Sequence, residues 1–124
     1  MRSAKEVAIA VTKALDSKKG MDIKILKIED LTVLADYFVI ATGNSNTQVK
    51  ALANETEYQL EQAGVNTLRR EGYDSGGWVL LDFNTVIVHI FQPSTRDFYA
   101  LERLWADAVP VSTEFLNEET ETKE

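Results

Sequence analysis

The feature that most constrains this fold is a hairpin that is apolar on both faces. It runs from residue 78 to residue 91 and reads WVLLDFNTVIVHIF. Successive side chains in a strand point to opposite faces, so each strand of the hairpin presents large apolar groups on both sides. On the first strand one face carries Trp78 and Leu80, and the other carries Val79 and Leu81. Such a hairpin needs a covering layer on each side.

The turn and the flanking segments supply the rest of a sheet. Asn84 lies in the connection of the hairpin, where it tolerates the positive φ of a tight turn. Residues 37–42 (YFVIAT) form a continuous apolar run that is typical of a central strand. Residues 21–28 alternate as a half-buried strand does, and residues 65–71 are a further candidate strand.

Two long helices and one short helix are expected as cover. Ser3 and Glu6 have the spacing of a capping box, and the helix they begin ends before Gly20. A second helix covers residues 47–63. A third begins at Pro93 and ends before Pro110. Ser94 and Asp97 form its capping pair, and its apolar face comprises Phe98, Leu101, Leu104 and Trp105.

This order of elements predicts an α+β fold with a mixed five-stranded sheet, two long helices and a short C-terminal helix. At 124 residues the chain is long enough for one hydrophobic core. We expect one domain over residues 1–113. Residues 114–124 (EFLNEETETKE) carry a net charge of −4, and we expect them to form an acidic, disordered tail.

Composition excludes several classes of function. The chain has no cysteine, so disulfides, thiolate metal sites and cysteine nucleophiles are excluded. Its net charge is −7, of which −3 falls on residues 1–113, and it has no basic cluster that would grip nucleic-acid phosphates. No apolar run approaches the roughly 20 residues of a membrane span, and no signal peptide is evident. We therefore expect a cytoplasmic protein with a protein partner.

Evidence for an enzyme is weak in the sequence. The Gly43–Ser45 turn between a strand and a helix resembles the phosphate-binding turn of nucleotidyltransferases, but no Asp-x-Asp follows, and Asp82 stands alone. The favoured interpretation is that Ser45 simply caps the second helix. His89 has no nucleophile or carboxylate beside it, which favours a structural or interfacial role. Two alternatives remain open: a relic nucleotidyltransferase that binds a nucleotide, and a self-associating scaffold that forms a homodimer.

Four stretches resemble the ribosomal silencing factor family, also called Iojap-like: DYFVIATGNSNTQVKAL (36–52), EG (71–72), the hairpin, and RDFYALERLW (96–105). The resemblance spans about residues 3–111. It implies a non-enzymatic protein with a nucleotidyltransferase-like fold that lacks the catalytic carboxylates. It further implies binding to ribosomal protein L-fourteen on the large subunit, which blocks joining of the small subunit when nutrients are scarce. Asn84 and Thr85 depart from the glycine and aspartate that are frequent in the family.

The leading prediction is a translation repressor that acts sterically, with no catalytic residue, cofactor or metal. Aromatic and arginine side chains dominate the energetics of many interfaces, and the segment from residue 78 to residue 105 is rich in them. The predicted partner anchors are Trp78, Leu80, His89, Phe91, Tyr99 and Trp105. The predicted rim or orienting groups are Asp82, Arg96 and Glu102.

Overall fold

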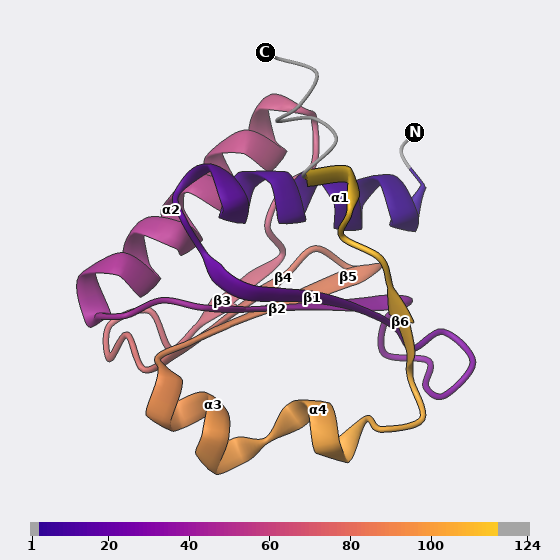
Figure 1. The fold of residues 1–124 in the computed structure, drawn as a ribbon. Coiled ribbons are helices and arrows are strands. Elements are labelled where there is room, and N and C mark those ends of the chain that lie inside the picture. The colour runs from indigo at the N-terminus through magenta and orange to yellow at the C-terminus, as the bar shows by residue number, and fades with distance from the viewer. Residues whose placement is uncertain (1–2, 117–124) are drawn as a thin grey trace.

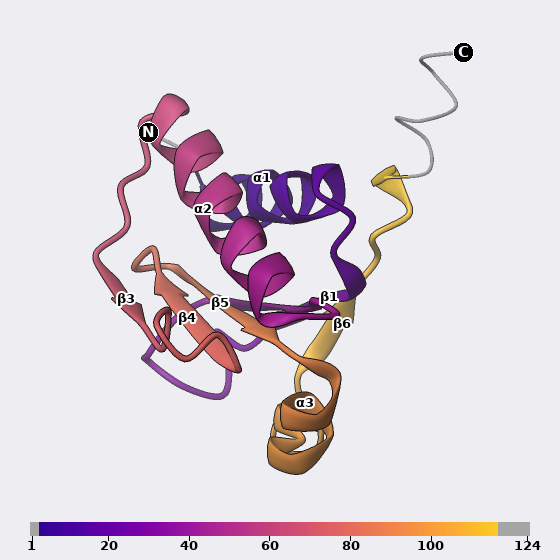
Figure 2. The same cartoon turned by 90° about the vertical axis from the view of Figure 1, so that its left-hand side faces the viewer.

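The computed structural model describes residues 3–116 and has three layers, with a sheet between two sets of helices (Figure 1). The long helices α1 (Ala4–Ser17) and α2 (Asn46–Gln62) lie on one face of the sheet. The short helices α3 (Pro93–Tyr99) and α4 (Leu101–Leu104) lie on the other. Figure 2 shows that α3 and α4 cover only part of their face. The predicted cover on both sides is therefore present, and it is unequal.

Within residues 3–116 the sheet is mixed, as predicted, but it has six strands instead of five. The strands are β1 (Met21–Lys27), β2 (Tyr37–Thr42), β3 (Arg69–Glu71), β4 (Trp78–Asp82), β5 (Val86–Phe91) and β6 (Val109–Val111). Their order is β3-β4-β5-β2-β1-β6, and only β2 and β5 run parallel. The additional strand β6 pairs with the outer edge of β1, where Lys27 lies opposite Val109.

Local sequence signals account for most of these boundaries. The amide N–H of Glu6 donates to Ser3 Oγ at 3.1 Å, and that of Ser3 donates to Glu6 Oε1 at 2.9 Å, which completes the predicted capping box. Ser45 Oγ accepts from the amide of Gln48 at 3.1 Å and caps α2. Asn84 has φ = 77°, as the predicted hairpin turn requires.

The prediction of one continuous third helix is wrong. The helix breaks at Ala100, which lies in the left-handed region (φ 47°, ψ 51°), and α3 and α4 result. The N-cap of α3 is Gln92, with no side-chain cap bond, so Ser94 does not begin the helix as the capping pair predicted. Phe98 and Leu104 are 81% and 74% exposed, although the predicted continuous helix placed them on its buried face.

Two further predictions, on the end of a helix and the extent of a strand, need correction. Pro110 does not simply end a helix, because it lies within β6. The strand predicted over residues 65–71 is limited to Arg69–Glu71 at the sheet edge, and its three side chains are exposed.

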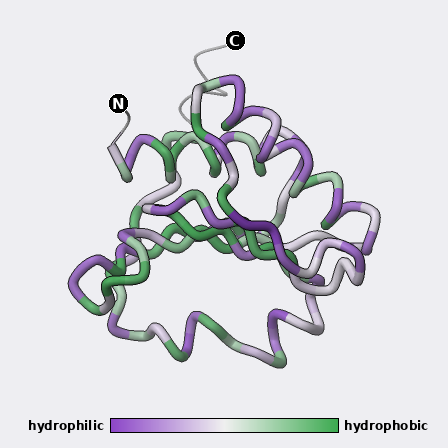
Figure 3. Tube along the Cα trace, turned by 180° about the vertical axis from the view of Figure 1, so that it is seen from behind, coloured by the Kyte–Doolittle hydropathy of each residue, from purple (hydrophilic) through white to green (hydrophobic). Residues whose placement is uncertain are grey.

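The sheet separates two clusters of buried side chains. The larger cluster lies under α1 and α2 and includes Val79, Leu81 and Val88 from the hairpin. The smaller one lies under α3 and α4 and includes Phe38 and Phe91. In Figure 3 the strands between the helical layers form the most continuously hydrophobic part of the trace. The alternating side chains of β4 and β5 thus contribute to both clusters, as the hairpin that is apolar on both faces predicted.

The predicted tail begins at residue 114, and residues 117–124 lie outside the described part of the chain. Within the described part, Phe115 is half-buried and packs against the larger cluster. Packed structure therefore continues two residues past the predicted end of the domain at residue 113. No helix within residues 3–116 is long and apolar enough to cross a membrane.

Replacing Ala100 with glycine should stabilise the protein. An L-residue in the left-handed conformation costs about 1–2 kcal/mol, and glycine avoids this cost but adds entropy to the unfolded chain. We expect Ala100→Gly to raise the free energy of unfolding by up to about 1 kcal/mol in urea titrations. The matched control is Ala106→Gly, since Ala106 is not among the residues with positive φ and should lose stability. Loss of stability in both variants would contradict the strained junction.

Candidate functional site

An aromatic cluster lies where the hairpin meets α3. The Trp78 ring packs against Tyr99, with ring centroids 4.6 Å apart, and against Phe91 at 4.9 Å. The indole Nε1–H of Trp78 donates to His89 Nδ1 at 3.1 Å. Strand alternation produces this contact, because Trp78 and Phe91 are directly paired in the ladder and His89 lies two residues before Phe91 on the same face.

His89 is the buried support of this cluster. Only 5% of its surface is exposed, and the edge of Phe38 packs against it at 4.9 Å. Since Nδ1 accepts the hydrogen bond from the Trp78 indole, the neutral imidazole carries its own proton on Nε2. This Nε2 is buried without a hydrogen-bond partner. Burial lowers the pKa of His89 to about 4. The imidazole is therefore neutral near pH 7 and holds the orientation of Trp78.

The nine predicted site residues differ in exposure. Buried residues are His89, Phe91 and Arg96; half-buried residues are Trp78, Leu80, Asp82, Glu102 and Trp105; Tyr99 is 46% exposed. The structure brings Trp78, His89, Phe91 and Tyr99 into one cluster. A partner can reach Tyr99 directly, whereas Phe91 has no exposed surface in this conformation.

Trp105 and Asp82 lie apart from the cluster. Trp105 packs edge-on against Phe38 at 5.2 Å and closes the far end of the smaller core. Asp82 stabilises the hairpin turn: its Oδ1 accepts from the amide of Asn84 at 2.8 Å, and Arg69 Nη2 lies 3.8 Å from its Oδ2.

Two exposed apolar residues escaped the sequence prediction. Phe98 and Leu104 project from the helix pair to solvent, and the ring of Phe98 lies 5.1 Å from that of Tyr99. No local signal could have identified them, since alanine at position 100 favours a continuous helix. We call the surface made of these side chains and their neighbours the α3–α4 face; its members are Trp78, Leu80, Phe98, Tyr99 and Leu104.

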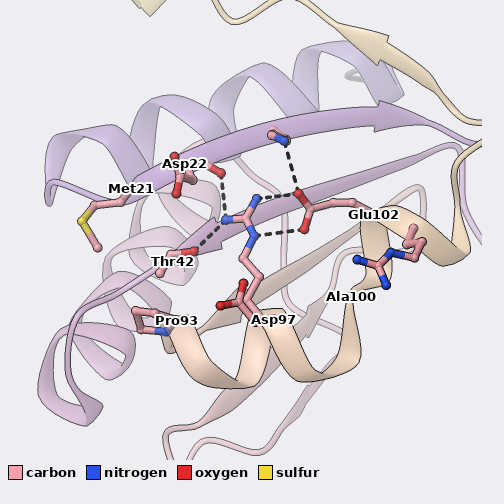
Figure 4. Close-up of a pocket in the computed structure, with 10 residues that line it drawn as sticks. Met21, Asp22, Thr42, Pro93, Asp97, Ala100 and Glu102 are labelled. Atoms are coloured by element: carbon pink, nitrogen blue, oxygen red, sulfur yellow. Dashed lines mark hydrogen bonds and ion pairs between the residues drawn. The ribbon is translucent and has the colours of Figure 1, made fainter.

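Arg96 fixes the helix pair to the sheet (Figure 4). Its Nε and Nη2 donate to the two carboxylate oxygens of Glu102 at 3.0 and 3.1 Å, across the break at Ala100. Its Nη1 donates to the carbonyl of Asp22 at 2.9 Å and to Thr42 Oγ1 at 2.6 Å. One buried side chain thus joins α3, α4, β1 and β2, which explains how the left-handed junction is maintained.

A hollow of about 560 Å³ beside this network is lined by charges of both signs. Lys24 Nζ lies 3.3 Å from Glu102 Oε2, so the carboxylate is shared between two cations. Hydrogen bonds from Arg96 lower the pKa of Glu102, against the opposing effect of its partial burial. Within this hollow Arg96, Glu102 and Lys24 are paired with one another, so these three groups connect the helix pair to the sheet.

The Gly43–Ser45 turn has little room for a phosphate. A side chain at Gly43 would meet Val49 at 3.0 Å, which shows how closely α2 packs on the turn. Gln48 Oε1 accepts the amide of Asn44 at 2.6 Å, and Ser45 Oγ is used as the cap. Of the two interpretations of Ser45, the structure supports the helix cap. Within residues 3–116, no group of three acidic, histidine or cysteine side chains is placed to hold a metal ion.

Comparison with known proteins gives the family. The sequence model of a protein family described as "Ribosomal silencing factor during starvation" matches residues 1–124. The ribosomal silencing factor of Chromobacterium violaceum is 44% identical over 105 residues, which is 85% of this chain and 86% of the relative. That of Bacillus subtilis is 41% identical over 102 residues, 82% of this chain and 86% of the relative. A crystal structure of a C. violaceum protein matches with a TM-score of 0.83 and 43% identity, covering 85% of this chain and 88% of that one.

The fold is α+β, and apolar side chains are exposed on α3 and α4. The chain belongs to the ribosomal silencing factor family, as the sequence resemblance predicted. This is a family of ribosome-associated translation regulators.

Acidification should destabilise the folded protein through the buried His89. The pKa of His89 is near 6.5 in the unfolded chain and about 4 in the folded one, so the unfolded state binds more protons between these values. Acidification from pH 7 to pH 4 should therefore cost about 3 kcal/mol of folding free energy through this group. His89→Gln keeps an acceptor for Trp78 without titrating. Urea titrations at both pH values should show a smaller acid loss in this variant, and equal losses would refute the assignment.

The nucleotide alternative predicts a different result at Ser45. Because aspartate caps helices as well as serine does, Ser45→Asp should retain most of the stability. Calorimetric titration of the wild type with nucleoside triphosphates and Mg²⁺ should show no binding below millimolar concentration. Micromolar binding that Ser45→Asp abolishes would instead identify the turn as a phosphate site.

Proposed function

We propose that the protein represses translation by binding ribosomal protein L-fourteen of the large ribosomal subunit through the α3–α4 face. Bound there, it sterically prevents the small subunit from joining. The observation that carries the proposal is the exposure of aromatic and aliphatic side chains on this face, with Phe98 81% and Tyr99 46% exposed. Contiguous apolar surface of this kind is typical of protein–protein interfaces.

The layout of the face supports a protein partner. Tyr99 lies over Trp78, and both rings combine an apolar body with a polar group, which suits them to the centre of an interface. Leu80 is half-buried on β4, two residues from Trp78 and so on the same face of the sheet. The buried members of the predicted site act from below, since His89 and Phe91 hold Trp78 in place.

Charge supports a basic protein as the partner and argues against a grip on RNA. The net charge is −7, and several of the cations are paired with carboxylates. Arg70 lies 3.0 Å from Glu57, Arg69 lies 2.9 Å from Glu71, and Arg96 is held by Glu102. A protein that binds RNA phosphates needs free cations and binds with a steep dependence on salt. Binding here should weaken only moderately as salt rises.

The proposed mechanism requires no catalytic reaction. A steric blocker must only occupy the contact surface on the large subunit before the small subunit arrives, so no cofactor or catalytic group enters the proposal. A rigid face lowers the entropy cost of binding, and the Arg96 network and the aromatic cluster supply that rigidity. We place this activity in the cytoplasm, where the ribosomal subunits meet.

Removing exposed aromatics from the α3–α4 face should weaken binding without unfolding the protein. Phe98→Ala and Tyr99→Ala should each lose about 2 kcal/mol of binding free energy if they are interface hot spots, roughly 30-fold in affinity. The readouts are binding to purified large subunits and repression in a purified translation system. Tyr58→Ala is the matched control, because Tyr58 is 60% exposed on α2, on the opposite side of the sheet.

Three outcomes would contradict the proposal. If both variants bind and repress like the wild type, the α3–α4 face is not the contact. If Tyr58→Ala fails equally, the effect is not specific to that face. Binding to assembled ribosomes as tight as to free large subunits would exclude the steric mechanism, even with the face correct.

A further inference from the structure

The loop between β1 and β2, residues 29–36 (EDLTVLAD), exposes apolar side chains that the fold does not use. Val33 is fully exposed, Leu34 is 66% exposed and Leu31 is 46% exposed. Three large aliphatic groups within four residues form a concentrated apolar patch, in contrast to the scattered single residues that are common on protein surfaces.

Hydrogen bonds hold this loop in a defined conformation. The amide of Leu31 donates to the carbonyl of Ile28 at 2.9 Å, and that of Leu34 donates to Thr32 Oγ1 at 3.1 Å. At the base, the amide of Ile28 donates to the carbonyl of Asp36 at 2.8 Å. The exposed side chains are therefore presented by a closed turn, which lowers the entropy cost of binding a partner.

The loop lies on the side of the sheet that α3 and α4 occupy. Figures 1 and 2 show the loop (purple) extending from the sheet toward the side on which α3 and α4 lie. The amide of Asp36 donates to the carbonyl of Thr85 in the hairpin turn at 2.8 Å. Ala35 packs into the same buried cluster as Leu101 of α4. Lys27 pairs with Val109, which is itself 56% exposed and follows α4 closely in the chain.

The distribution of exposed apolar groups indicates one extended surface. Among residues 3–116, most exposed large hydrophobic side chains belong to this loop, to the helix pair or to the start of β6. The two on other elements are Tyr58 and Leu68. The loop and the α3–α4 face thus form two parts of one side of the molecule.

Charge identifies the kind of partner. Glu29, Asp30 and Asp36 flank the three aliphatic groups. Lys27 Nζ lies 3.1 Å from Glu29 Oε1, and the hydrogen bond to Glu29 and the charges of Glu29 and Asp30 all raise the pKa of Lys27, so the carboxylates of this loop exceed its cations. Carboxylates repel RNA phosphates and attract lysine and arginine. The matching surface is therefore a protein patch that combines aliphatic side chains with basic ones.

We propose that loop 29–36 is a second contact with the protein that the α3–α4 face binds, and that it takes an aliphatic patch flanked by lysine or arginine. This inference rests on the proposed function, because it assigns the same partner. Contacts at both ends of one side would fix the orientation of the bound domain, and a steric blocker depends on orientation as well as affinity.

The test uses the full chain with Val33 and Leu34 both replaced by serine. Both side chains are exposed, so the melting temperature should remain that of the wild type. Affinity for purified large subunits, and for isolated ribosomal protein L-fourteen, should fall roughly tenfold or more. The matched control is Leu68→Ser, since Leu68 is 66% exposed, like Leu34, but lies before β3 at the opposite edge of the sheet. It should bind like the wild type.

The outcomes separate this inference from the proposed function. Wild-type binding by the loop variant, with a loss in Tyr99→Ala, overturns the second contact and leaves the function intact. A loss with large subunits but not with the isolated protein means that the loop contacts another component, which also overturns it. If the wild-type chain binds neither, the proposed function fails and this inference fails with it. Equal losses in both assays, with Leu68→Ser unaffected, support the second contact.

Discussion

The apolar character of the sheet on both faces is the constraint on which the rest of the molecule depends. On β5, Val88 and Ile90 point to one side and Phe91 to the other, so each side must be shielded from water. The two shields are built differently. The 14 and 17 residues of α1 and α2 cover one face with regular apolar stripes. The 7 and 4 residues of α3 and α4 cover less of the other, and they rely on a polar anchor.

That anchor is Arg96, and its position explains the exposed face. A short helix pair buries too little apolar surface to hold itself firmly, and here one guanidinium joins it to two strands. The same guanidinium bridges to Glu102 across the left-handed junction at Ala100. A continuous helix would turn Phe98 and Leu104 toward the sheet, as the helical spacing predicted. In the structure both side chains are exposed instead. Phe98 lies two residues after the buried Arg96, on the opposite side of α3, so the thin cover carries an apolar outer surface.

Local signals made much of the fold predictable from the sequence. The capping box at Ser3, the continuous run of β2 and the turn at Asn84 each act over a few residues, and each was confirmed. The errors arose where distant residues decide. Strand β6 exists because residues 109–111 reach the free edge of β1, and nothing in VPV favours a strand on its own. The break at Ala100 is bridged by a bond between side chains six residues apart, a contact that no propensity scale contains.

In the candidate site, too, the local sequence pattern predicted part of the arrangement, and contacts between distant residues decided the rest. Alternation correctly placed Trp78 and Leu80 on one face of their strand, but it could not show which of the predicted anchors α3 would cover. Burial by α3 and α4 gives these residues different roles, since Phe91 is fully buried whereas Trp78 retains exposed surface. They remain coupled, because one indole ring contacts His89, Phe91 and Tyr99. A change at His89 therefore alters the surface that the proposed partner would meet, although the imidazole lies beneath that surface. The residues predicted as one site thus comprise an outer layer that is exposed and an inner layer that supports it.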